Sequence, residues 1–237
     1  GKIGDRYFGI PLIMDIADRY GISVTFFVEV LNHYYFGKHE TRQVCRYIIE
    51  RGHDVQLHLH PNYLNFTRQY PEELVFKDNM SAYGAARQTE LIQEGKELLQ
   101  EYGVKEPVAF RAGNYGADQN TIGALSKNGF VFDSSYNLAF PRKNSSLFAQ
   151  PLNDLARIGD IFELPVTCFQ TDIGFFKKRV PMDINGAGFR QMRDTLRFAS
   201  KNDFRCVTFI LHSFSFFYSK DPQYRTVKIR KNIITRF

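Results

Sequence analysis

The chain of 237 residues is 43% hydrophobic and 24% charged, values typical of a globular protein that argue against disorder. Its formal charge of +6 comes from scattered lysines and arginines, with the densest run at residues 177–179, so we expect a solvated surface and no nucleic-acid partner. No apolar run approaches the ~18 residues of a membrane span, and the three widely spaced cysteines form no CxxC pair, which argues against a cysteine zinc site.

Predicted helices and strands alternate along most of the chain. Apolar residues at helical spacing predict helices over residues 9–20, 41–51, 85–102, 118–128 and 188–201. β-branched and aromatic runs predict strands over residues 24–30, 108–111, 130–133, 162–166 and 206–211, and a further strand in the run that carries His58 and His60. This alternation favours one α/β domain with a mostly parallel sheet, in which the less regular residues 137–160 and 168–185 are insertions over one end.

The two ends of the chain bear on the domain boundaries. A short polar lead runs into the first predicted helix with no predicted strand before it, and the basic residues 229–237 stop without a helix cap or breaker. An α/β barrel that begins with a helix lacks its first strand. We therefore expect residues 1–237 to be a single domain truncated at both ends.

The stretch GHDVQLHLHP, residues 52–61, places two histidines two positions apart on an apolar, alternating run. In a strand the side chains of His58 and His60 point to the same face, and residues i and i+2 lie roughly 6.6 Å apart, within reach of one metal ion. Two polar residues on a half-buried face are the plain alternative. The spacing and the following proline are nevertheless compatible with a metal site.

Further polar residues lie at the ends of the predicted strands, where parallel α/β folds place their chemistry. These residues are Glu29, Arg111 with Asn114 and Tyr115, Asp133 with Ser134 and Ser135, Glu163, and His212 with Ser213. Each has a structural alternative: Arg111 could pair with Asp133, which could instead be a turn residue, and His212 could be a core histidine. Together with His58 and His60, they predict a metal hydrolase site.

Several of these motifs, in their order, resemble the polysaccharide deacetylase (NodB-type) family, also called carbohydrate esterase family four. The matching segments are GISVTFFV (residues 21–28), GHDVQLHLHP (52–61), FRAGNYG (110–116), FDSS (132–135) and ILHS (210–213). The resemblance implies a distorted (β/α) barrel of about seven strands, and a divalent metal, usually zinc, held by two histidines and an aspartate. On this chain the histidines are His58 and His60.

The chain departs from the family pattern in three places. The aspartate ligand and the catalytic base belong to a Thr-Phe-Asp-Asp-like motif on the first strand, and no such motif occurs here; the only upstream acid is Asp5, in the polar lead. The family usually spaces its histidines His-x-x-x-His, which makes Asn62 a fallback ligand. Its arginine motif commonly reads Arg-x-Pro-Tyr, whereas Tyr115 comes one residue later here.

The function implied by the resemblance is removal of acetyl groups from an N- or O-acetylated sugar or polysaccharide. The metal would polarise the acetyl carbonyl and acidify water. Arg111 would orient the base, the Tyr115 backbone N–H would help bind the oxyanion, His212 would act as general acid, and Asp133 would tune His212. The alternatives are a barrel hydrolase of the amidohydrolase type, a relative that opens a small cyclic amide, and a catalytically silent glycan-binding barrel.

Overall fold

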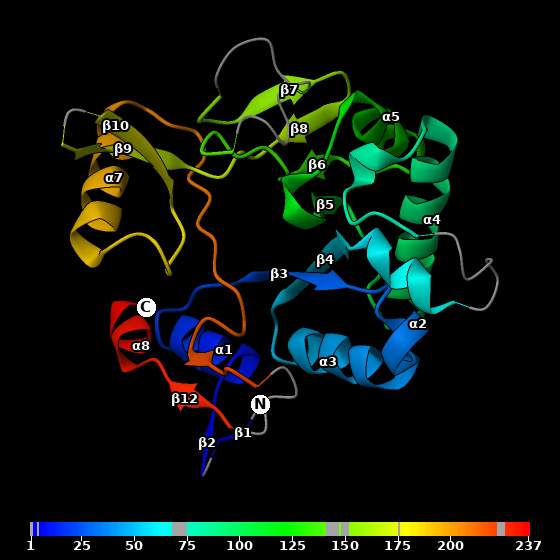
Figure 1. Ribbon diagram of the computed structural model, residues 1–237, viewed down its shortest axis with the longest axis horizontal. Coiled ribbons are helices and arrows are strands. Elements are labelled where there is room, and N and C mark those ends of the chain that lie inside the picture. Colours follow the sequence, from blue (N-terminus) through cyan, green and yellow to red (C-terminus); the bar gives the residue numbers. More distant parts are fainter. Residues whose placement is uncertain are drawn as a thin grey trace.

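The computed structural model describes residues 2–3, 5–67, 75–140, 147, 152–174, 176–221 and 226–237. At the centre of the fold lies a six-stranded sheet with the order β3–β4–β5–β6–β8–β7 (Figure 1). Its strands are β3 (Thr25–Glu29), β4 (Asp54–Leu59), β5 (Ala109–Ala112), β6 (Phe132–Asp133), β7 (Ala156–Ile158) and β8 (Ile161–Glu163). The pairs from β3 to β8 are parallel and β7 is antiparallel at the edge, which confirms the predicted α/β class with a mostly parallel sheet.

The helices follow the predicted alternation. They are α1 (Ile10–Arg19), α2 (His33–Phe36), α3 (Lys38–Glu50), α4 (Ala85–Glu101), α5 (Gln119–Lys127), α7 (Phe189–Lys201) and α8 (Lys231–Arg236). Short 3₁₀ turns, η1 (Pro61–Phe66), η2 (Met80–Ala82) and η3 (Gly113–Tyr115), follow β4, precede α4 and follow β5. In Figure 1, α3, α4 and α5 lie along one side of the central sheet. No helix among the described residues is long and apolar enough to cross a membrane.

Close packing of α4 on β4 fixes the position of the strand that carries the histidines. Val55, Leu57 and Leu59 alternate along β4 and are at most 1% exposed. A Cβ atom at Gly95 of α4 would lie 2.8 Å from Cδ1 of Leu57, so only glycine permits this approach. The apolar face of β4 is thereby buried, and the opposite face is left for His58.

Three details of the sequence-based prediction need correction. Residues 168–185, expected to be irregular, form an antiparallel hairpin of β9 (Cys168–Ile173) and β10 (Phe176–Pro181). A short hairpin of β1 (Lys2–Ile3) and β2 (Arg6–Tyr7) precedes α1, where no strand was predicted, and it lies outside the central sheet.

The third correction concerns the predicted strand at residues 206–211. It is seen only as isolated parallel bridges, which pair Thr208 with Val166 and Ile210 with Asp183. Near the chain end, β11 (Phe217–Tyr218) pairs with β12 (Lys228–Ile229) in a separate sheet. Within the described residues the isolated parallel bridges extend the parallel order past β8, but they do not close a barrel.

Candidate metal and acyl-transfer site

His58 and His60 come together at the carboxyl end of β4. His58 is in the strand, whereas His60 directly follows it and begins the turn η1. Their ring centroids lie 4.8 Å apart with an interplanar angle of 86°, and both residues are half-buried. The two rings therefore lie edge to face at the carboxyl end of β4, although His60 lies one residue beyond the strand that was predicted to carry both.

Each of these rings has a hydrogen-bond acceptor opposite Nδ1. His58 Nδ1 lies 2.5 Å from the backbone oxygen of Arg111, and His60 Nδ1 lies 2.8 Å from Oδ1 of Asp78. A carbonyl oxygen can only accept, so His58 carries its proton on Nδ1, and the carboxylate favours the same tautomer in His60. Both Nε2 atoms are then left with a free lone pair, the form of imidazole that binds a metal.

Burial keeps the His58 ring neutral. Its pKa is lowered from 6.5 to about 3, chiefly by desolvation and then by electrostatic interaction with His60, Arg111 and His212, against the hydrogen bond to the Arg111 carbonyl. A neutral ring is the form required of a ligand, so His58 can bind a cation across the physiological pH range.

Arg111 lies beside His58 on the neighbouring strand, since the two residues are register partners in β4 and β5. Its guanidinium donates from Nε to the Ser134 carbonyl at 3.1 Å and from Nη2 to Ser134 Oγ at 2.8 Å. It also lies over the ring of Phe27, with Cζ 4.5 Å from the centroid. Desolvation lowers the pKa of Arg111, but the group stays charged, and these contacts hold that charge at the sheet edge.

Tyr115 is in a tight loop directly after β5. Asn114 and Tyr115 have φ angles of 54° and 58°, a left-handed conformation that few residues other than glycine adopt. The Tyr115 ring stacks on Phe140 with centroids 5.9 Å apart, and desolvation raises the pKa of its hydroxyl. Two consecutive residues of this kind identify a constrained loop at the site.

Asp133 lies behind the site and is 0% exposed. It is the register partner of Glu163. Desolvation raises the pKa of both carboxyls, and the neighbouring Asp133 charge raises the pKa of Glu163 further. Such a pair is stable when it shares a proton. Ser135 Oγ donates to Asp133 at 2.6 Å and accepts from Ala112 N–H at 2.9 Å, so the pair supports the end of β5.

His212 reaches the same region from the far end of the sequence. It follows Ile210, which bridges to Asp183, and its ring stacks on Phe214 with centroids 4.9 Å apart. Desolvation lowers the pKa of His212, the Asp183 charge opposes this, and Arg111 and His60 lower it further. Arg111 and His60, two of the predicted site residues, are thus among the groups that act on the His212 pKa.

Two acids of this site were not singled out from the sequence. Asp78 lies in an aperiodic segment before η2, and Asp183 follows the hairpin that was expected to be irregular. Asp183, rather than the predicted Asp133, is the acid whose charge raises the His212 pKa. Only the fold reveals their proximity, because neither residue is in a predicted strand.

The two histidines, His58 and His60, are donors of a kind that suits a divalent cation. Two imidazoles with free Nε2 atoms are ligands that zinc prefers, and a catalytic zinc keeps at least one position open. Within the described residues, no group of three or more His, Cys, Asp and Glu side chains is arranged to hold an ion. Asn62, the fallback ligand, is exposed in η1. His58 and His60 are therefore the two candidate ligands among the described residues.

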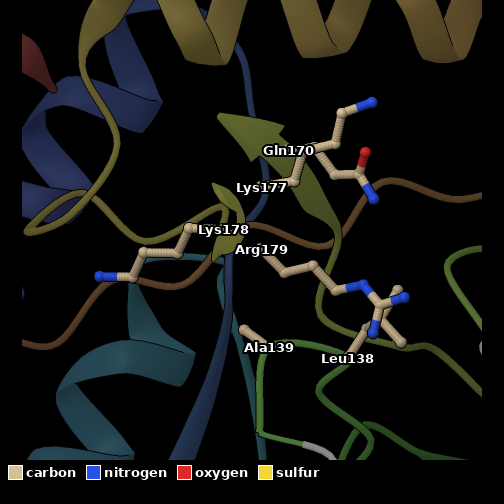
Figure 2. Close-up of a pocket in the computed structure, with 6 residues that line it drawn as sticks. All are labelled: Leu138, Ala139, Gln170, Lys177, Lys178 and Arg179. Atoms are coloured by element: carbon tan, nitrogen blue, oxygen red, sulfur yellow. The ribbon is translucent and has the colours of Figure 1, made fainter. Parts of the chain in front are cut away.

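A separate cavity of about 540 Å³ lies between the β9–β10 hairpin and the segment after β6 (Figure 2). It is lined by Leu138, Ala139, Gln170, Lys177, Lys178 and Arg179. The basic run expected in a loop thus belongs to strand β10. None of the predicted site residues lines this cavity, so it is distinct from the histidine site.

Comparisons with known proteins give limited information. No family model and no curated protein matches the chain. Among solved structures it is similar to a Mycobacterium smegmatis protein assigned as a polysaccharide deacetylase, with 20% identity over 82% of this chain and 59% of that chain, at a TM-score of 0.49. The chain thus spans about 59% of the length of that protein.

Two further solved structures are similar to the chain. They are a family 4 carbohydrate esterase from Streptomyces lividans in complex with acetate (14% identity, 58% of this chain, 60% of that chain, TM-score 0.39) and the chitin deacetylase of Colletotrichum lindemuthianum (16%, 66%, 66%, TM-score 0.40). Each of the three is described as a deacetylase or a carbohydrate esterase. Similarities of this size do not establish a shared activity, which has to be argued from the side chains.

Proposed function

We propose that this chain carries the site of a metal-dependent carbohydrate deacetylase that removes acetyl groups from an N-acetylated sugar or polysaccharide. The observation that carries the proposal is the pair of half-buried imidazoles, His58 and His60, each with Nδ1 opposite an acceptor. Motif order and the three deacetylase-like structures are compatible with it. A divalent metal, most simply zinc, would supply Lewis-acid chemistry at an acetyl carbonyl.

The surrounding residues have separate roles in this proposal. His58 and His60 would hold the cation through Nε2. Arg111 keeps a positive charge next to them, and the Tyr115 backbone N–H helps to bind the developing oxyanion. Asp133 acts as a positioning residue, because Ser135 joins it to the Ala112 N–H at the end of β5, directly before the loop that carries Tyr115.

His212 delivers a proton to the departing amine. Its pKa lies below the ordinary value of 6.5, so the protonated ring is a stronger acid than free histidine, but at neutral pH the ring has to take up the proton before it can deliver it. The residue is exposed at the surface although its ring is partly desolvated, so a substrate can reach it. Asp183 opposes the lowering of the pKa and so favours the protonated form.

Two variants test these roles. His212→Ala should keep its metal and lose about 10²–10⁴-fold in turnover, because it removes proton delivery and no ligand. His58→Ala should lose metal affinity and turnover together, because one ligand is gone. The measurements are zinc content by atomic absorption and acetate release from an N-acetylglucosamine oligomer, with the exposed His39→Ala on α3 as control.

Other outcomes would refute specific parts of the proposal. Loss of metal in His212→Ala with retention in His58→Ala would show that the roles are reversed. Zinc-loaded protein that binds the oligomer without releasing acetate would favour a glycan-binding barrel, and ring opening of a small cyclic amide without acetate release would favour the cyclic-amide alternative.

A further inference from the structure

His60 needs a support that the sheet does not supply. The pairing of β4 with β5 ends at Leu59, so His60 lies beyond the ladder, with extended backbone angles of φ −117° and ψ 91°. His58, by contrast, is held by its register partner Arg111. The direction of the His60 ring must therefore come from side-chain contacts.

Asp78 makes the contact that orients this ring. Its Oδ1 lies 2.8 Å from His60 Nδ1, and the two side chains are 31% and 28% exposed. A partly desolvated carboxylate is a strong acceptor, and it favours the tautomer with the proton on Nδ1. The remaining ring nitrogen, Nε2, then carries the lone pair.

Asp78 is itself fixed by the loop after β5. Asn114 Nδ2 donates to the second carboxylate oxygen, Oδ2. Asn114 can do so because it adopts the left-handed conformation (φ 54°, ψ 17°), which asparagine tolerates better than most residues. The segment after Asp78 is joined to the same loop by the Ser81 N–H, which donates to the Gly116 carbonyl at 2.8 Å.

Two glycines allow these segments to meet. A Cβ at Gly113 would lie 2.7 Å from His60 Nδ1, and a Cβ at Gly116 would lie 2.5 Å from Cβ of Asn79, the residue after Asp78. Neither approach is possible for a residue with a side chain unless the neighbour moves. The loop thus leaves space for the His60 ring and for the segment that carries the carboxylate.

We infer that Asp78, held by Asn114, is a positioning residue that sets the tautomer and direction of His60 for metal binding. The inference rests on the proposed function, because it concerns one of the two proposed ligands. Carboxylate partners of ligating histidines fix the ring and raise its basicity, and their loss typically lowers metal affinity about 10–100-fold.

The first measurement needs no metal. In the metal-free protein at pH 8, ¹⁵N–¹H spectra of the histidine side chains should show His60 protonated at Nδ1. In Asp78→Ala the proton should move to Nε2 in a substantial fraction of the molecules, and Asn114→Ala should shift the population in the same direction by less. Asp160→Asn, a substitution on the exposed turn between β7 and β8, is the matched control and should leave the tautomer unchanged.

The second measurement is zinc affinity by competition with a chromogenic chelator. Asp78→Ala should bind zinc about 10–100-fold more weakly than wild type, while Asp160→Asn should bind it equally well. Asp78→Asn keeps the size of the side chain and so serves as a second variant in case Asp78→Ala does not fold. Its zinc affinity should lie between those of Asp78→Ala and wild type. Circular dichroism checks that each variant is folded.

The outcomes separate this inference from the proposed function. Wild-type protein that binds no zinc would overturn the proposed function. Wild-type protein that binds zinc, with unchanged affinity and tautomer in the folded Asp78→Ala variant, would overturn the role of Asp78 alone. A wild-type His60 protonated at Nε2 would also overturn it.

Discussion

Replacing Glu29 with glutamine should change how the stability of the protein depends on pH. Glu29 ends β3, its Oε1 accepts the Leu31 N–H at 2.5 Å, and its Oε2 is buried without a hydrogen-bond partner among the described residues. Desolvation raises the pKa of this carboxyl from 4.5 to about 8, although the backbone N–H groups of Leu31, His60 and Asn32 oppose the change. The charged form is therefore disfavoured in the folded protein.

The sign and size of the effect follow from proton linkage. Between pH 4.5 and about 8 the folded state keeps a proton on Glu29 that the unfolded state has lost, so stability falls as pH rises through this window. Each unit of pKa difference corresponds to about 1.4 kcal/mol, which gives a loss of roughly 4 kcal/mol by pH 7.5. Glutamine keeps an oxygen for the Leu31 N–H and does not ionise, so Glu29→Gln removes this loss.

The measurement is the free energy of unfolding in urea from pH 4.5 to pH 8.5, with a chelator present because a bound metal would stabilise the folded state. Relative to wild type, Glu29→Gln should gain about 4 kcal/mol between pH 4.5 and pH 7.5. Glu97→Gln on the exposed face of α4 controls for the loss of a carboxylate. Parallel stability curves for wild type and Glu29→Gln would refute the reasoning, since they would mean that Glu29 titrates alike in both states.

Three further substitutions test the packing around the site. Gly113→Ala should lower zinc affinity about 10–100-fold in the chelator competition, because its Cβ would lie 2.7 Å from His60 Nδ1. Gly95→Ala should lower the free energy of unfolding in urea by about 1 kcal/mol, because contact with Leu57 at 2.8 Å outweighs the gain of about 1 kcal/mol in helix propensity. Asp118→Ala should cost about 1–2 kcal/mol in the same assay, because Asp118 caps α5 through the N–H three residues on.

The parallel part of the fold could be predicted from the sequence because its signals are local. The stripe of α4 and the alternation of Val55, Leu57 and Leu59 follow the periods of a helix and a strand, and both elements form where expected. The meeting of His58 with Arg111 also follows from local information, because polar residues at the ends of adjacent parallel strands share one edge. His212 was predicted from the end of the strand expected over residues 206–211 and from motif order, although that segment forms only isolated bridges among the described residues.

Other parts of the site could not be predicted because their signals are not local. Asp78 lies in a segment without hydrophobic period, and its contact with His60 spans 18 positions in the sequence. The hairpin of β9 and β10 was missed because its exposed strand carries consecutive charged residues, at 177–179, where an alternating pattern would identify a strand. Asp183, which directly follows Met182 at the end of this region, was missed with it.

The two histidines differ in the hydrogen-bond acceptor that orients each ring. This difference determines which of the two acceptors can be predicted from the sequence. His58 is oriented by a backbone carbonyl, so its partner is fixed by strand register and would remain if the side chain at position 111 changed. His60 is oriented by a side chain from a loop, so its partner depends on the identity of residue 78 and on the loop geometry at Asn114. A backbone carbonyl is present in every sequence of this fold, whereas a carboxylate at position 78 has to be encoded. The two-residue spacing therefore implies the position of both rings but the tautomer of His58 alone. The tautomer of His60 is the feature of this site most readily changed by substitution.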